Sequence, residues 1–218
     1  SVLLSAVLAA AGFMIVRELS SRQKEKEDFR ELAEIVNVTP TEPPATDTPP
    51  IEEFSIEEEP QNGRNLSELF AMNDDCVGWL FIPGTAVDYP VMHTPENPQK
   101  YLRLNFYGEY SQSGVPFLDG RCGLDSDNLI LYGHNMKNGT MFSDLKRYTD
   151  QNFRSEHPII ELETADGKQI YTVADVRITD TSDEWYSEIN TTSGRFLTLS
   201  TCYGSSKNGR LLVLAVSR

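Results

Sequence analysis

The sequence predicts a mainly β domain, a closed barrel or a sandwich with few short helices, preceded by a membrane anchor and a linker. Short apolar runs rich in Val, Ile, Leu, Phe and Tyr recur from residue 78 onward, and turn pairs such as Pro83-Gly84 and Asp166-Gly167 separate them. An uncharged, largely apolar run over residues 1–16 predicts the anchor. The 218 residues allow one domain of ordinary size plus such extra segments.

The N-terminal run, residues 1–16, ends at Arg17. It is slightly shorter than the ~20 residues that span a bilayer, so we expect a truncated transmembrane anchor or, as the alternative, a signal peptide cleaved near residues 9–11. We favour the anchor because apolar residues continue beyond those alanines as far as Val16. In both cases we expect the rest of the chain to lie outside the cytoplasm.

Residues 17–62 are expected to form a helical stalk followed by an acidic, Pro-rich linker. As far as Val38 the chain is rich in Glu, Lys and Arg, with Phe29, Leu32 and Ile35 at helical spacing, which is typical of a solvated helix. Residues 40–60 hold seven acids, no base and six of the chain's 12 prolines, which predicts an extended spacer. The net charge of −14 and the pI of about 4.6 disfavour a nucleic-acid partner.

Residues 63–218 are expected to form the globular domain. The apolar runs predict seven strands, over 78–82, 87–91, 128–132, 159–162, 169–178, 196–201 and 211–216. Helical spacing of apolar residues predicts two helices, over 66–72 and 140–148. The sequence contains no Gly-rich phosphate loop and no paired-Cys zinc spacing.

Cys202 is the candidate nucleophile. The three cysteines are an odd number, so at least one stays unpaired and a disulfide scaffold is excluded. Cys202 closes an apolar run, a polar loop of seven residues follows, and Arg210 opens the next run. In an antiparallel hairpin these two residues lie opposite each other. A guanidinium beside a sulfur favours the thiolate and can also hold an oxyanion during acyl transfer.

A cysteine nucleophile needs a proton partner, and the chain has three histidines. His134 follows the predicted strand 128–132, in a strand-end loop where catalytic side chains are commonly presented. His157 precedes Pro158 at the start of another strand, and His93 lies in a polar turn. The position of His134 favours it over the other two, for which surface or capping roles are the simpler interpretation.

The residues around Cys202 and His134 resemble the sortase family. Thr198–Cys202 followed by Arg210 resembles the sortase active-site signature, and Asn128–Lys137 resembles the histidine segment of class B sortases. Further segments resemble class B in the same order along the chain, namely 77–85, 88–91, 101–106 and 139–145. The resemblance covers about Asn65 to Arg218 and implies a sortase-type closed β-barrel of about eight strands around a groove.

The resemblance also implies a function. A class B sortase is a cysteine transpeptidase that joins secreted proteins to the cell wall of a Gram-positive bacterium, without a metal or an organic cofactor. Cys202 would be the nucleophile, His134 the general acid and base, and Arg210 the clamp on the oxyanion or the substrate backbone. The implied partners are secreted proteins with a C-terminal sorting signal of the Asn-Pro-x-Thr or a related type, and an amine of lipid II or of a peptidoglycan cross-bridge. The chain would be a single-pass membrane protein with its catalytic domain outside the cell.

The chain departs from the class B pattern in two places. Only residues 179–194 separate two strands between which class B members usually carry a long segment with a helix, and that segment normally forms one wall of the substrate groove. Tyr203 follows the nucleophile where class B commonly has an acidic residue. Six residues are therefore weaker candidates for substrate contact: Ser200, Thr201 and Tyr203 beside the nucleophile, Leu104 and Asn105 in the 101–106 segment, and Trp185 in the short segment.

Two other functions stay open at this point. A pilin-polymerising sortase would use the same three catalytic residues with a lysine amine as the acceptor. A non-catalytic, membrane-tethered barrel that binds peptides would have no reason to keep a reactive thiol at Cys202. A thiol-directed probe therefore discriminates the binding module from the two enzymes.

Overall fold

The computed structural model describes residues 2–37, 63–190 and 193–218. The expected acidic linker, for the most part, lies outside these residues. Within them the chain forms eight strands and several short helices, in the order α1 (Val2–Val36), α2 (Ser67–Met72), β1 (Cys76–Phe81), β2 (Asp88–Met92), η1 (Lys100–Leu102), β3 (Phe117–Leu118), β4 (Asn128–Tyr132), η2 (Phe142–Thr149), α3 (Gln151–Glu156), β5 (Ile159–Thr164), β6 (Gly167–Asp180), η3 (Glu184–Ser187), β7 (Phe196–Cys202) and β8 (Gly209–Ser217).

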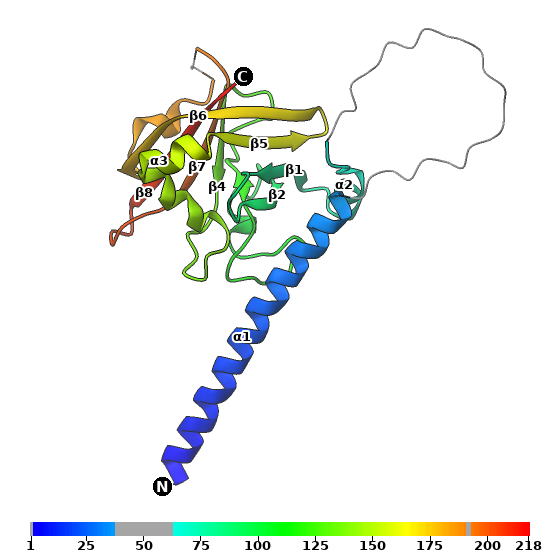
Figure 1. Cartoon of the computed structure of the whole chain (residues 1–218). Coiled ribbons are helices and arrows are strands. Elements are labelled where there is room, and N and C mark those ends of the chain that lie inside the picture. The colour runs from blue at the N-terminus through cyan, green and yellow to red at the C-terminus, as the bar shows by residue number, and fades with distance from the viewer. Residues whose placement is uncertain (1, 38–62, 191–192) are drawn as a thin grey trace, which may run out of the picture.

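The strands close into a barrel in the order β1-β2-β3-β4-β7-β8-β6-β5, with β5 paired to β1 (Figure 1). This confirms the mainly β fold, and the closed ring decides between barrel and sandwich. Most pairs are antiparallel, but β2 pairs with β3 and β4 pairs with β7 in parallel. The parallel β4–β7 pair matters most for function, because it brings together the ends of two strands that lie far apart in the sequence.

Two apolar clusters stabilise the fold. One fills the barrel and includes η2 and α3, and the other packs α1 and α2 against the outside of β1, β2 and the segment before β3. The predicted helix over 140–148 is a 3₁₀ helix, η2, rather than an α-helix. Its buried residues Phe142, Leu145 and Tyr148 recur every three positions, and a helix with three residues per turn aligns that spacing on one face.

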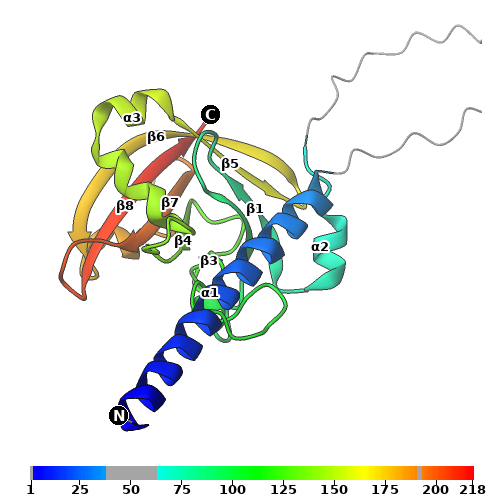
Figure 2. The ribbon, with the colours of Figure 1, turned by 60° about the horizontal axis from the view of Figure 1, so that its bottom comes forward.

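The N-terminal helix α1 differs from the expected solvated stalk. It is continuous over 35 residues, and its C-terminal part lies against the barrel (Figures 1 and 2). Leu32 is 0% and Val36 1% exposed, and the ring of Phe29 meets that of Tyr89 edge to face at 5.0 Å. Each buried side chain of this kind contributes about 2 kcal/mol by leaving water. Residues 29–36 are therefore part of the globular unit.

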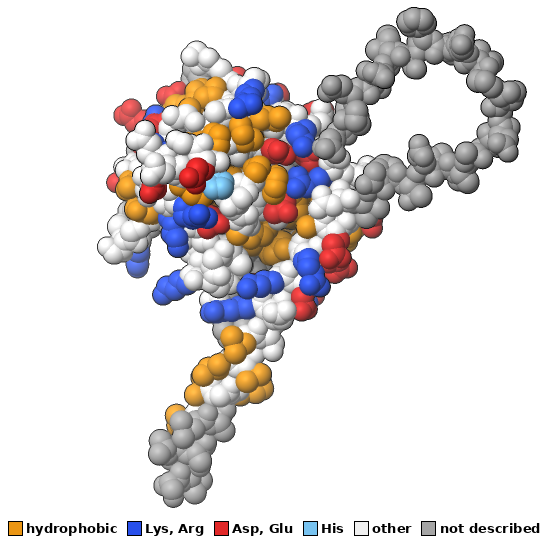
Figure 3. All heavy atoms as spheres, viewed as in Figure 1, with side chains coloured by type: hydrophobic (Ala, Val, Ile, Leu, Met, Phe, Trp, Pro, Cys, Tyr) orange, Lys and Arg blue, Asp and Glu red, His pale blue; other side chains and the backbone are white. Residues whose placement is uncertain are grey.

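The rest of α1 extends away from the barrel and carries exposed apolar side chains, among them Phe13, Met14, Ile15, Val16 and Leu19. Among the helices that the structure describes, none combines the length and the apolar composition of a bilayer span. Lys and Arg side chains gather where this helix meets the barrel, next to the apolar stretch (Figure 3).

Candidate active site

Cys202 and Arg210 face each other at one rim of the barrel. Cys202 is the last residue of β7, and its partner across the antiparallel pair is Arg210 of β8. The register is the one that the apolar pattern predicts. Cys202 is exposed, whereas Cys76 and Cys122 are buried free thiols. Burial raises the pKa of Cys76 to about 11, which leaves that thiol protonated.

His134 reaches the same rim through the parallel pairing of β4 and β7. Tyr132 pairs with Ser200, so His134 and Cys202 each lie two residues beyond a paired position. The two strand ends are also joined by hydrogen bonds. Thr201 Oγ1 donates to the Gly133 carbonyl at 2.7 Å, and Asn135 Nδ2 donates to the Cys202 carbonyl at 3.0 Å. These bonds hold the loop that carries His134 beside the end of the nucleophile strand.

Gly133 has a packing reason to be glycine. A Cβ atom at this position would lie 2.7 Å from the ring of Phe142, which is fully buried below it. The chain therefore passes directly over η2 between Tyr132 and His134. The first residue of η2 helps to set the height at which the imidazole is presented.

The protonation of His134 is set by one main-chain bond. Its Nε2 lies 3.0 Å from the Leu102 carbonyl, and because a carbonyl only accepts, Nε2 carries the proton. Nδ1 is then the nitrogen left for proton transfer. Burial lowers the pKa of His134, the bond to Leu102 raises it, and the charge of Arg103 lowers it, so that the net shift is downward. The neutral imidazole is the resting form that this environment favours.

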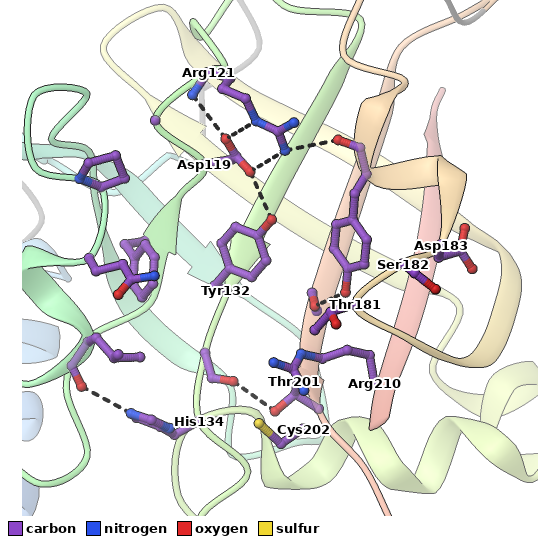
Figure 4. Close-up of a pocket in the computed structure, with 18 of the residues that line it drawn as sticks. Asp119, Arg121, Tyr132, His134, Thr181, Ser182, Asp183, Thr201, Cys202 and Arg210 are labelled. Atoms are coloured by element: carbon purple, nitrogen blue, oxygen red, sulfur yellow. Dashed lines mark hydrogen bonds and ion pairs between the residues drawn. The ribbon is translucent and has the colours of Figure 1, made fainter. Parts of the chain in front are cut away.

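Arg210 is held by main-chain groups of its own loop. Its Nη1 donates to the carbonyls of Lys207 at 3.1 Å and of Gly209 at 2.9 Å. Figure 4 shows the guanidinium beside Cys202, on the opposite side of the sulfur from His134. A positive group in this position can stabilise negative charge on the oxygen of an acyl group attached to Cys202.

The three residues lie at one end of a groove of about 680 Å³. Its other residues come from the segment before β3, from β3 and β4, and from the segment between β6 and β7, and include Gln99, Leu102, Phe117, Asp119, Arg121, Tyr132, Thr181, Asp183, Glu184, Tyr186 and Ser187. The short segment 179–194 therefore still supplies a wall, built on the 3₁₀ helix η3. The expectation that its shortness puts this wall in doubt is corrected by that helix.

The far end of the groove is a hydrogen-bonded network that the sequence analysis missed (Figure 4). Arg121 donates to both carboxylate oxygens of Asp119, at 2.9 and 2.8 Å, and its Nη2 also reaches the Tyr186 carbonyl at 2.9 Å. The Tyr132 hydroxyl donates to Asp119 at 2.8 Å. Burial would raise the pKa of Asp119, but the bonds from Arg121 and Tyr132 outweigh it and lower the pKa. The Asp-Gly turn around residue 119 was the only signal in the sequence.

The weaker candidates divide between the groove and its surroundings. Ser200 and Thr201 line the groove, and the hydroxyl of Ser200 lies 2.7 Å from that of Tyr186. Tyr203 packs against the barrel core. Trp185 donates its indole N–H to Thr198 at 2.9 Å and lines a separate hollow.

The structure places Leu104 and Asn105 outside the groove lining. Leu104 packs against the apolar cluster beneath α1, and Asn105 Oδ1 accepts hydrogen bonds from the main chain of Tyr107 and Glu109. Both residues therefore shape the segment, while its neighbour Leu102 reaches the groove and the imidazole.

Comparisons with known proteins agree with this site. The sortase domain family matches residues 80–218. Sortase B of Staphylococcus aureus is 32% identical over 179 residues, which cover 69% of this chain and 73% of that protein. Sortase B of Listeria monocytogenes is 37% identical over 123 residues, which cover 56% of this chain, and the match spans 49% of the relative's length.

Solved structures agree as well. Sortase B from B. anthracis, in complex with AAEK1, superimposes with a TM-score of 0.69 at 26% identity, covering 92% of this chain and all of that one (100%). The S. aureus sortase B–substrate complex gives a TM-score of 0.62 at 31% identity and covers 70% of this chain and 84% of that one. The family match, the relatives and the shared barrel together show that this chain belongs to the sortase family of cysteine transpeptidases, in its class B.

Proposed function

We propose that this chain cleaves a C-terminal sorting signal after a Thr residue and transfers the protein to an amine of a peptidoglycan precursor. The observation that carries the proposal is the convergence of Cys202, His134 and Arg210 at one end of the groove. The S. aureus relative is described in complex with a substrate and also with triglycine, which supports a peptide donor and an amine acceptor.

The first half-reaction forms a thioester. Cys202 Sγ attacks the Thr carbonyl carbon, its proton passes to His134, and Arg210 stabilises the oxyanion. The C–N bond after Thr then breaks, and His134 returns the proton to the leaving amine. The acyl group stays on Cys202 and the C-terminal fragment departs.

The second half-reaction restores an amide. The acceptor amine attacks the thioester carbonyl, His134 accepts the amine proton, and the C–S bond breaks. The proton returns to the Cys202 sulfur, so the enzyme is regenerated and no oxidant or reductant is consumed. An Asn-Pro-x-Thr type signal is the proposed donor, and a lipid II or cross-bridge amine is the proposed acceptor.

The chain is further proposed to act at the outer face of the membrane, attached through its N-terminal helix. The apolar surface of α1 followed by a cluster of Lys and Arg side chains supports this placement, because such a pair matches the apolar core and the anionic head groups of a bilayer. The proposed organisation is an anchor over 1–16, a helix and acidic linker over 17–62, and a catalytic domain over 63–218. The buried contacts of residues 29–36 make the end of that helix part of the catalytic unit.

The test is mass spectrometry of the chain incubated with peptides of the Asn-Pro-x-Thr, Leu-Pro-x-Thr and Ser-Pro-x-Thr types and an added amine. We expect a thioester adduct on Cys202, cleavage after Thr and an amide product with one of the peptides. The Cys202→Ala variant should give none of the three. Cleavage that survives in Cys202→Ala, or no adduct with any peptide from the folded chain, would overturn the proposal.

A further inference from the structure

The helix α1 binds the segment that supports His134 through one carboxylate. Glu25 accepts hydrogen bonds from Ser111 Oγ at 2.7 Å, from Ser113 Oγ at 2.6 Å and from the main-chain N–H of Gln112 at 3.2 Å. Ser111 and Ser113 are 2% and 3% exposed. A carboxylate that satisfies two buried hydroxyls and a main-chain donor is a strong local contact, because charge-assisted bonds are about twice as strong as neutral ones.

The contact continues from Ser111 to the catalytic histidine. Ser111 Oγ, which donates to Glu25, accepts from the Gly114 N–H at 3.1 Å. Gly114 has φ +59°, and a Cβ atom there would lie 2.7 Å from the Leu102 carbonyl oxygen, so its main chain packs directly against that carbonyl. The same oxygen accepts from His134 Nε2 at 3.0 Å.

Main-chain bonds tie the two arms of this segment together on either side of Leu102. The Ser111 N–H donates to the Arg103 carbonyl at 2.9 Å, and the Val115 N–H donates to the Tyr101 carbonyl at 3.1 Å. The Arg103 guanidinium also donates to the Gln112 carbonyl at 2.8 Å. A displacement of the 111–114 turn is therefore transmitted to the position of the Leu102 carbonyl.

We propose that Glu25 is a positioning residue for catalysis, which fixes the Leu102 carbonyl through Ser111 and Gly114 and so holds His134 in its Nε2–H form. This inference rests on the proposed role of His134 and adds that the N-terminal helix completes the active site. Glu25 touches neither the substrate nor the reacting atoms, and it acts through the main chain of its partner segment.

The charged groups around His134 determine the direction of the expected effect. Arg103 lies on the segment that carries Leu102, and Cys202 and Arg210 line the groove from the β7–β8 hairpin. Farther along the groove, Asp119 and Arg121 are paired with each other. The bond to Leu102 raises the pKa of His134, against burial and the charge of Arg103, so weakening this bond lowers the pKa of His134 further.

The experiment uses the full 218-residue chain with ¹³C,¹⁵N-labelled histidine and NMR titration of the His134 ring. In Glu25→Gln we expect the pKa of His134 to fall by about half a unit, the ¹⁵N shifts to report loss of the fixed Nε2–H form, and kcat/KM for the sorting peptide to fall about fivefold. Glu27→Gln is the matched control, since Glu27 is an exposed carboxylate on the same helix that pairs with Gln23. It should change none of these quantities.

A second pair of variants separates the relay from general loosening of the contact. Ser111→Ala and Ser113→Ala each remove one hydroxyl bonded to Glu25, but only Ser111 also accepts from Gly114 in the described contacts. We expect Ser111→Ala to reproduce the His134 shift of Glu25→Gln, and Ser113→Ala to leave it near the wild-type value.

An unchanged His134 signal in folded Glu25→Gln, or equal shifts in the two serine variants, would overturn the inference. The NMR readout does not depend on turnover. A chain in which Cys202→Ala still cleaves peptides would refute the proposed function while leaving the His134 result to be judged separately.

Discussion

The two ends of the groove are built in opposite ways. At the far end, side chains bond to side chains: Arg121 and Tyr132 both donate to Asp119, and Arg121 also reaches the main chain of Tyr186. At the reactive end, within the described contacts, His134 and Arg210 bond to main-chain carbonyls rather than to each other or to Cys202. The far end is preorganised as a wall, whereas the reactive side chains stay free to exchange protons and to meet a developing charge.

The largest expected effect breaks the reactive end. Arg210→Ala should lower kcat/KM for the sorting peptide by about 10²–10³, the usual loss on removing one oxyanion donor. Arg210→Lys should recover part of this loss, because it keeps the charge but not the planar fork of donors. Cleavage of a fluorescence-quenched peptide measures both variants. Near wild-type activity in Arg210→Ala would show that the oxyanion is held elsewhere.

The second prediction breaks the far end. Asp119→Ala removes the shared acceptor of Arg121 and Tyr132, so we expect a loss of about 2 kcal/mol in the free energy of unfolding, measured by urea titration. KM should rise while kcat changes little, because the wall shapes binding rather than the chemical step. Asp74→Ala, at an exposed aspartate, is the control. A selective loss in kcat would contradict the division of the groove into two ends.

The third prediction follows from the lowered pKa of Asp119. A carboxyl whose pKa is lower in the folded state stabilises the protein above its unfolded value, near 3.8, and loses that contribution as the pH falls through the lower folded value. The stability difference between wild type and Asp119→Asn should therefore be complete at pH 7 and should shrink below about pH 4. Unfolding curves across this pH range test it. A difference that grows in acid would contradict the sign of the shift.

The smallest expected effect sharpens the comparison at the boundary between the two ends. Tyr186→Phe removes only the bond to Ser200 Oγ, at a position that is 1% exposed, and should cost about 1 kcal/mol. We expect a rise of about fivefold in KM for the peptide with little change in kcat. Tyr110→Phe, at a side chain that is 78% exposed, is the control and should behave as wild type.

The sequence predicted local features well because their signals are local. The hairpin with Cys202 opposite Arg210 follows from two apolar runs and a loop between them, and β4 has the predicted bounds 128–132. The two-residue strand β3 gave no such signal, since a run as short as Phe117–Leu118 has no periodicity. Helix α3 was likewise missed, because only Phe153 among its six residues is buried.

The candidate site was predicted only in part. Cys202, Arg210 and His134 lie at strand ends, where the apolar pattern stops, and the family resemblance assigned their roles. Leu102, Tyr186 and the Asp119–Arg121 pair carry no distinguishing pattern, because their importance comes from neighbours that lie far away in the sequence. Their roles, like those of the catalytic residues, remain predictions for the experiments above.

By itself the sequence determined the fold class, most of the strands, the nucleophile hairpin and the family. Only the tertiary structure decided which strand ends meet, that the short segment after β6 still forms a wall, and that α1 lies against the barrel with Glu25 on the loop beside Leu102. The physical reason is that periodicity and turn residues act between near neighbours in the chain. Parallel pairing, groove walls and the docking of a helix depend instead on which distant surfaces bury each other best.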